Sequence, residues 1–86
     1  MNATGQLTMY TTQWCGYCRR LKSQLAREGI AMREIDIERD DEAARFVMSV
    51  NGGNQTVPTV VAIAQDGTEH VLTNPSAKTL KALIGA

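Results

Sequence analysis

The sequence lacks the net charge, the long apolar runs and the leader that are typical of nucleic-acid-binding, membrane and secreted proteins. Nine basic residues balance nine acidic ones, so a net charge of zero leaves no electrostatic footprint for nucleic acid or an anionic membrane surface. No stretch approaches the roughly 20 consecutive apolar residues of a membrane-spanning helix. The N-terminal residues carry neither a basic start nor a continuous apolar run, which argues against a secretory signal. We therefore expect a soluble cytoplasmic protein that is a monomer or a weak oligomer.

The shortage of cysteine and histidine is equally restrictive. Cys15 and Cys18 are the only cysteines, and His70 is the only histidine. A closed zinc site needs four ligands, and His70, on a predicted strand, is the single further candidate, so we expect no metal site within one chain. Two cysteines are too few for a secreted disulfide scaffold, and closing so short a ring would stabilise the fold by only about 2 kcal/mol. Redox chemistry is the remaining use of the pair.

What the chain does contain is enough apolar sequence for one core. Eighty-six residues, 43% of them hydrophobic, make one small domain, which we expect to span residues 1–86. Alternation and helical spacing predict the order β-α-β-α-β-β-α. The predicted elements are a strand at 7–11, a helix from about Cys15 to Glu28, a strand around Ile35–Ile37, a helix from Asp40 or Asp41 to Val50, strands at 59–64 and 69–73, and a last helix opened by Asn74-Pro75-Ser76.

A few residues mark the ends and inner faces of these elements. Gly29 supplies a left-handed stop for the first helix, and Pro75 is expected in the first turn of the last helix. Met32 falls out of phase with Ile35, so the start of the second strand is undefined. Helical spacing predicts two buried stripes, made of Ala43, Phe46, Val47 and Val50 in the second helix and of Leu80, Leu83 and Ile84 in the last.

The connections between the strands set the fold class. A helix joins the first two strands, which should therefore lie parallel, whereas the last two form an antiparallel hairpin around Asp66-Gly67. We expect an α/β domain in which three helices flank a four-stranded mixed sheet. The chain has no internal repeat and no low-complexity linker.

The position of the cysteine pair favours thiol–disulfide exchange. Cys15 follows a predicted strand and stands where a helix begins, so its sulfur should lie near the unpaired N–H groups of the first turn. That partial positive charge favours the thiolate, which is the nucleophilic form. Cys18 lies one turn later and can donate its S–H to the Cys15 sulfur. We therefore expect Cys15 to be an exposed attacking thiol and Cys18 a partly buried resolving thiol.

The residues around the pair allow two interpretations each. Trp14 can line a substrate groove or pack at the end of the strand, whereas Tyr17 is favoured as a groove wall because it stands between the cysteines. Arg19, Arg20 and Lys22 can be an ordinary solvated helix face, or they can support the thiolate and attract anionic partners.

The combined motifs resemble the glutaredoxin family along essentially the whole chain. Cys-x-x-Cys at a helix start and Thr56-Val57-Pro58 before the third strand carry the resemblance, which implies a thioredoxin-like fold. In that family the matching proline is cis and lies beside the active disulfide, and the backbone at Val57 would pair with the substrate. Thioredoxin is a weaker match, because Tyr17 stands where thioredoxin has proline.

Two departures from glutathione-using glutaredoxins point to another thiol. Those proteins carry a lysine at the position of Thr12, and a Gly-Gly pair with an aspartate where this chain has Thr73-Asn74-Pro75-Ser76. The missing groups would hold the charged ends of glutathione. Together with Cys-Gly-Tyr-Cys, "VNGGN" and "TVPTV", the polar replacements resemble the mycoredoxins, which use the sugar-linked cysteine thiol mycothiol.

This resemblance implies a specific reaction and leaves two rivals open. It implies reduction of protein–mycothiol mixed disulfides, with Cys15 and Cys18 catalytic, no bound cofactor, mycothiol as thiol co-substrate, and NADPH acting through mycothiol disulfide reductase. The substrate-binding set would be Thr12, Trp14, Tyr17, Thr56, Val57, Pro58, Asn74, Pro75 and Ser76. One rival is a general dithiol reductase fed by a thioredoxin-type reductase. The other is a dimeric iron–sulfur carrier, an option that Gly16 keeps open.

Overall fold

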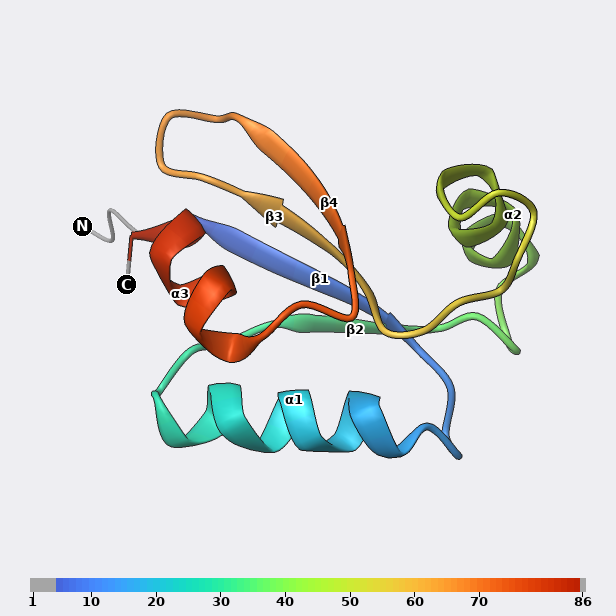
Figure 1. Ribbon diagram of the computed structural model, residues 1–86, viewed down its shortest axis with the longest axis horizontal. Helices are drawn as coiled ribbons and strands as arrows, with labels where there is room; N and C mark the ends of the chain where they lie inside the picture. The colour runs from blue at the N-terminus through green and yellow to red at the C-terminus, as the bar shows by residue number, and fades with distance from the viewer. Residues whose placement is uncertain (1–4, 86) are drawn as a thin grey trace.

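A four-stranded mixed sheet forms the centre of the computed structural model, which describes residues 5–85 (Figure 1). The elements are β1 (Gln6–Thr11), α1 (Gly16–Arg27), β2 (Arg33–Asp36), α2 (Asp41–Val50), β3 (Thr59–Ile63), β4 (Glu69–Thr73) and α3 (Ala77–Ile84). The strand order is β2-β1-β3-β4. Strand β1 pairs parallel with β2 and antiparallel with β3, and β3 and β4 form the expected hairpin. The predicted mixed α/β sheet is confirmed, while the ends of the expected 1–86 domain, including the start of the N-terminal segment, lie outside the described residues.

One face of the sheet is covered by α1 and α3. Alternate residues of β1 point to this side, and Met9 is fully buried against β3 and both helices. The core on this face also contains both cysteines, which couples the redox pair directly to the packing of the domain. Its buried members are Leu7, Met9, Cys15, Cys18, Leu21, Leu25, Ile30, Val60, Ala62, Leu80 and Ile84.

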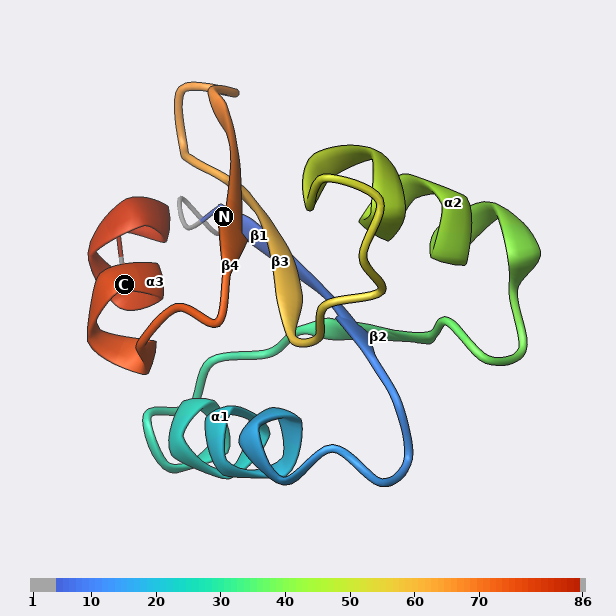
Figure 2. The same cartoon turned by 45° about the vertical axis from the view of Figure 1, so that its right-hand side comes forward.

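Helix α2 covers the other face with a smaller core (Figure 2). Ile37, Ala43 and Val47 are buried there against Tyr10 and Ile35. Met32 instead packs against the core beneath α1, so Met32 and Ile35 face opposite sides of the sheet. This explains why their spacing gave no single register for the second strand.

Side chains cap the starts of the three helices. Cys15, Asp40 and Ser76 each accept a hydrogen bond from a backbone N–H of the first turn. The cap at Asp40 resolves the two alternatives for α2. The expectation for Pro75 was wrong, because Ser76 caps α3 and Pro75 therefore precedes the helix.

Two strand boundaries and the burial of one residue differ from the sequence-based expectations. Ile37 lies just beyond β2, although it remains buried beneath α2, and Ala64 lies just beyond β3. Val50 was expected to be buried but is 39% exposed, because it is the last residue of α2 and projects past the small core. Gly29 has the left-handed φ of +70° that was predicted.

The two ends of the described chain meet at one pole of the domain. The Gly5 N–H donates to the Ile84 carbonyl at 2.9 Å, which joins the start of β1 to the end of α3. The N-terminal end of α1, and with it the cysteine pair, lies toward the opposite pole (Figure 1). Among residues 5–85, no helix combines the length and apolar character needed to cross a membrane.

Candidate active site

The cysteine pair sits at the start of α1 and forms a disulfide. Cys15 and Cys18 have Cα atoms 5.3 Å apart, and Cys15 is the N-cap of the helix. The backbone N–H of Cys18 donates to the Cys15 sulfur at 3.1 Å. After reduction, a negative charge on this sulfur would face that N–H and the positive end of the helix dipole. The structure thus places Cys15 where its thiolate is favoured, and the backbone N–H of Cys18 is one of the first-turn donors that were expected near this sulfur.

The expected exposure of Cys15 was wrong for this oxidised state. Cys15 is only 5% exposed and Cys18 is 1% exposed. Both sulfurs are bonded to each other, and both side chains belong to the core beneath the sheet. The order of exposure is nevertheless the predicted one, because Cys15 is the more accessible of the two.

The loop before β3 carries the predicted cis peptide bond between Val57 and Pro58. Pro58 is almost fully buried. Val57 is partly buried and packs against both cores, including the one that holds the cysteines, while Thr56 is also partly exposed. The Pro58 carbonyl accepts the Asn74 N–H at 2.8 Å. The structure therefore joins this loop to the turn before α3, two segments that the sequence could relate only by resemblance.

Two exposed aromatic side chains flank the disulfide. Trp14 is 69% exposed and Tyr17 is 61% exposed, so neither packs in the core. The Trp14 indole N–H donates to Glu38 Oε2 at 3.1 Å, which fixes the ring across to the segment after β2. Of the two interpretations of Trp14, core packing is excluded by this exposure.

A hollow of about 280 Å³ opens beside Tyr17 between α1 and the turn before α3. Its lining includes Asn74, Pro75 and Ser76, all predicted to bind substrate. Among residues 5–85, Arg20 is the only charged residue in the lining, and no carboxylate borders the hollow. Such a surface suits a ligand that offers hydroxyl and amide groups more than one that carries several charges.

Three lining residues of this hollow were not among the predicted binding residues. Arg20, Leu21 and Gln24 follow Tyr17 on the same side of α1. Their positions relative to Tyr17 are i+3, i+4 and i+7, the spacing of one helix face. This helical period could have identified the three residues from the sequence. If Tyr17 at the start of the helix lines a groove, the residues at i+3, i+4 and i+7 should line the same groove.

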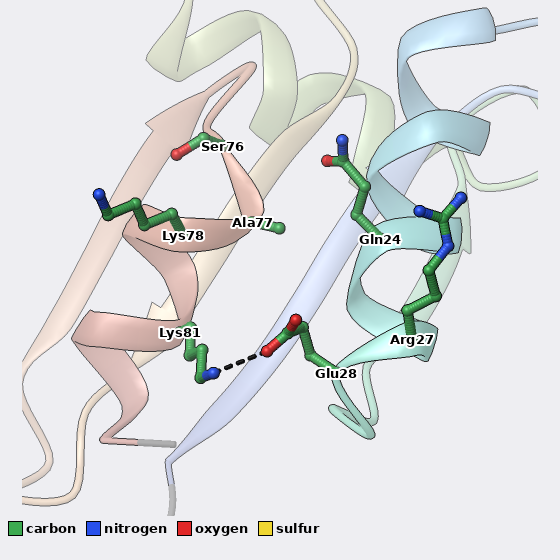
Figure 3. Close-up of a pocket in the computed structure, with 7 residues that line it drawn as sticks. All are labelled: Gln24, Arg27, Glu28, Ser76, Ala77, Lys78 and Lys81. Carbon is green, nitrogen blue, oxygen red and sulfur yellow. Dashed lines mark hydrogen bonds and ion pairs between the residues drawn. The ribbon is translucent and has the colours of Figure 1, made fainter.

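A second hollow, of about 450 Å³, continues along the seam between α1 and α3 (Figure 3). Gln24 and Ser76 line both hollows, so the two are neighbours. An ion pair between Glu28 and Lys81, at 2.6 Å, connects the helices farther along the seam. The hydrogen bond and charge of Lys81 lower the pKa of Glu28 below its ordinary value of 4.5.

Thr12 lies directly behind the cysteine pair. Its carbonyl accepts the Cys15 N–H at 3.4 Å, and the residue is 5% exposed. The Thr12 hydroxyl is enclosed and has no hydrogen-bond partner in the described part of the chain. A ligand could reach this oxygen only if neighbouring groups moved. Among residues 5–85, no group of three His, Cys, Asp or Glu side chains is arranged to hold a metal.

A disulfide across the first turn of a helix, with a donor at the attacking sulfur, is built for thiol–disulfide exchange. The surrounding fold is that of thioredoxin-like proteins. Thioredoxin O2 from Arabidopsis thaliana superposes with a TM-score of 0.61 over 96% of this chain and 74% of its own, at 18% identity. The fold thus defines the class, a thioredoxin-like protein that carries a disulfide at the start of its first helix.

Closer relatives narrow the class to one family. The sequence profile of the glutaredoxin family matches residues 7–67. A glutaredoxin homologue of Mycobacterium tuberculosis is 58% identical over 92% of this chain and 89% of its own length. Mycoredoxin 1 of Corynebacterium glutamicum is 45% identical over 93% of this chain and 94% of its own. The glutaredoxin from Archaeoglobus fulgidus superposes with a TM-score of 0.65 at 26% identity, over 95% and 88% of the two chains. The chain belongs to the glutaredoxin family and is a thiol-disulfide oxidoreductase of mycoredoxin-like sequence.

Proposed function

We propose that this glutaredoxin reduces protein–mycothiol mixed disulfides. The observation that carries the proposal is the hollow next to Tyr17, where Gln24, Asn74 and Ser76 supply polar groups and Arg20 is the single charged residue among the described lining residues. Mycothiol is a sugar-linked thiol, and hydroxyl and amide groups are the partners that a sugar needs. The similarity to a relative named mycoredoxin supports the same choice.

The reaction proceeds by two exchanges of a sulfur–sulfur bond. The Cys15 thiolate attacks the mycothiol sulfur of the mixed disulfide, a Cys15–mycothiol bond forms, and the client protein leaves as its thiolate. In the second step, either a second mycothiol thiolate or Cys18 attacks. The first route releases mycothiol disulfide, and the second releases mycothiol and forms the Cys15–Cys18 disulfide. The backbone N–H of Cys18 favours the charged sulfur of Cys15 when it attacks in the first step and when it leaves in the first route of the second step.

The remaining parts of the proposal concern the partners and their supply of electrons. Mycothiol is the co-substrate, and an NADPH-dependent mycothiol disulfide reductase regenerates it. Mycothiolated proteins are the clients, and we assign client backbone pairing to Val57, with Thr56 and Pro58 completing the binding loop. Trp14 and Tyr17 form the walls of the groove, and the enzyme acts as a monomer in the cytoplasm.

A side-by-side turnover assay tests the choice of thiol. One client peptide is blocked with mycothiol or with glutathione, and each is reduced with the corresponding thiol. We expect a clear preference for mycothiol, because the hollow lacks the paired charges that would hold the two charged ends of glutathione. Equal rates with both thiols would refute the assignment.

Cysteine variants test the mechanism separately. Cys15→Ser should abolish turnover, whereas Cys18→Ser should retain most of the reduction of mixed disulfides, because a second mycothiol can complete the cycle. An inactive Cys18→Ser protein would instead support the general dithiol reductase. A visible absorbance band after anaerobic reconstitution with iron and sulfide would support the cluster carrier.

A further inference from the structure

The side chain of Asn51 forms a hydrogen-bonded cluster that the redox chemistry does not explain. Asn51 directly follows α2, and its Nδ2 donates to the Val47 carbonyl at 2.8 Å and to Thr59 Oγ1 at 3.0 Å. Its Oδ1 accepts the Thr73 hydroxyl at 2.7 Å. The side chain thus uses both of its amide hydrogens and its carbonyl oxygen, so one residue connects α2, β3 and β4.

The direction of the bonds in this cluster is determined by Thr59. The Thr59 hydroxyl donates to the Thr56 carbonyl at 2.7 Å, so it can only accept from Asn51. That requirement places the amide nitrogen of Asn51 toward Thr59 and its oxygen toward Thr73. Thr59 is completely buried and Asn51 is partly buried, so water competes little for the bond between these two residues, whereas the bond from Thr73 lies at the surface.

The cluster reaches both segments that border the site. Thr56 begins the loop with the cis-proline, and Thr73 immediately precedes Asn74, which lines the hollow beside the disulfide. A backbone bond from the Asn74 N–H to the Pro58 carbonyl, at 2.8 Å, joins the same two segments. The Asn51 cluster is therefore a second connection between them, and it lies outside the hollow itself.

We propose that Asn51 is a positioning residue that, through Thr59 and Thr73, fixes the Thr56–Pro58 loop relative to the turn at Asn74 and so sets the shape of the thiol-binding surface. The inference rests on the proposed function, since it assigns these two segments to thiol binding. A small displacement of a binding segment can cost a large factor in rate or affinity. Asn51 itself does not touch the reacting sulfurs, and its effect should appear in KM rather than in the nucleophile.

The test removes one bond of the cluster with little change of shape. Thr73→Val deletes the hydroxyl that donates a hydrogen bond to Asn51, and Thr73→Ser retains that hydroxyl. Ser49→Ala is the matched control, because it removes a 2.6 Å bond to the Phe46 carbonyl on α2 without touching the cluster. Asn51→Ala, alone and combined with Thr73→Val, shows whether the two residues act through one contact.

We expect Thr73→Val to raise KM for the mycothiol mixed disulfide by about fivefold, the effect of one lost hydrogen bond, with kcat within twofold of wild type. The pH dependence of Cys15 alkylation by iodoacetamide should not change. Amide hydrogen exchange of Asn74 should accelerate in the free protein, while Thr73→Ser and Ser49→Ala behave as wild type. The double variant should be no worse than Asn51→Ala.

Two results would overturn the positioning role. One is unchanged KM and unchanged Asn74 exchange in Thr73→Val, and the other is a loss of kcat with a shifted alkylation profile. If wild type shows no preference for mycothiol, the proposed function fails, and KM is then measured with the glutathione mixed disulfide. The exchange of Asn74 requires no substrate, so it decides the positioning role independently of the thiol.

Discussion

Replacing Thr12 with valine should make the protein more stable. Thr12 is only 5% exposed, and its hydroxyl lacks a partner among the described residues. Valine has nearly the same shape and the same β-branching, so the substitution removes the unpaired oxygen without opening a cavity. A buried polar group without a hydrogen bond costs about 1–3 kcal/mol, and we take the lower end of this range for a single neutral hydroxyl.

The neighbouring threonine supplies the matched control. Thr11 is equally buried at 5% exposure, but its hydroxyl donates to the Thr12 carbonyl at 3.1 Å. Thr11→Val therefore removes a satisfied bond and should lower stability by about 1 kcal/mol, whereas Thr12→Val should raise it by a similar amount. For a domain of this size, each change corresponds to about 4–8 °C in Tm, in opposite directions.

Thermal unfolding followed by circular dichroism measures both variants, with the disulfide intact in every sample. A fall in Tm for Thr12→Val, or equal shifts for the two variants, would refute the reasoning from the unpaired hydroxyl. Turnover of the mycothiol mixed disulfide adds a functional readout. If Thr12 binds the thiol, as the family resemblance implies, KM should rise by about fivefold in the stabilised variant, since one hydrogen bond to the ligand is lost. An unchanged KM would remove Thr12 from the binding set.

Three further predictions concern two glycines and one ion pair. Gly16→Pro should raise the free energy of unfolding by about 0.4–1 kcal/mol in denaturant titrations, because Gly16 is the first residue of α1, a side chain there would meet open space, and the preceding residue is extended. Gly5→Ala should lower Tm by about 4–8 °C or more, because its Cβ would collide with the Ile63 carbonyl of β3, and unaltered melting would contradict that contact. The pKa of Glu28 should lie below 4.5 by NMR titration and rise in Lys81→Gln. Because folding lowers this pKa, the stabilisation is present above pH 4.5 and is lost as the pH falls through the lowered value.

The sequence predicted the order of the elements because each carries a clear period. Alternation in β1, helical spacing in α1 and the Asp66-Gly67 turn all depend on neighbouring residues, so local reasoning was sufficient. The sequence-based predictions failed where tertiary packing determines the burial of a residue or the exact end of a helix. Val50 satisfied the helical period but ends α2 beyond the small core, and Pro75 was placed inside a helix whose cap is the next residue, Ser76.

In the site, too, features made by neighbouring residues could be predicted from the sequence, whereas features made by residues distant in sequence could not. The cap at Cys15 could be predicted from the chain alone, because helix N-termini are formed by adjacent residues. The Asn51 cluster could not, because its partners Thr59 and Thr73 are 8 and 22 residues away in sequence. The burial of Cys15 was missed for a related reason, since it depends on how the oxidised pair packs against the sheet.

The hydrogen bond between Gly5 and the Ile84 carbonyl has a consequence for chain connectivity. The described ends of the chain meet at one pole, and the cysteine pair lies toward the other. The order in which the elements are linked can therefore be changed without altering the redox site. A circular permutant that joins these ends by a short linker and opens the chain within the Gln65–Thr68 turn should retain the disulfide and the cis-proline loop. Both elements of the redox site would then be carried on a chain that begins with β4.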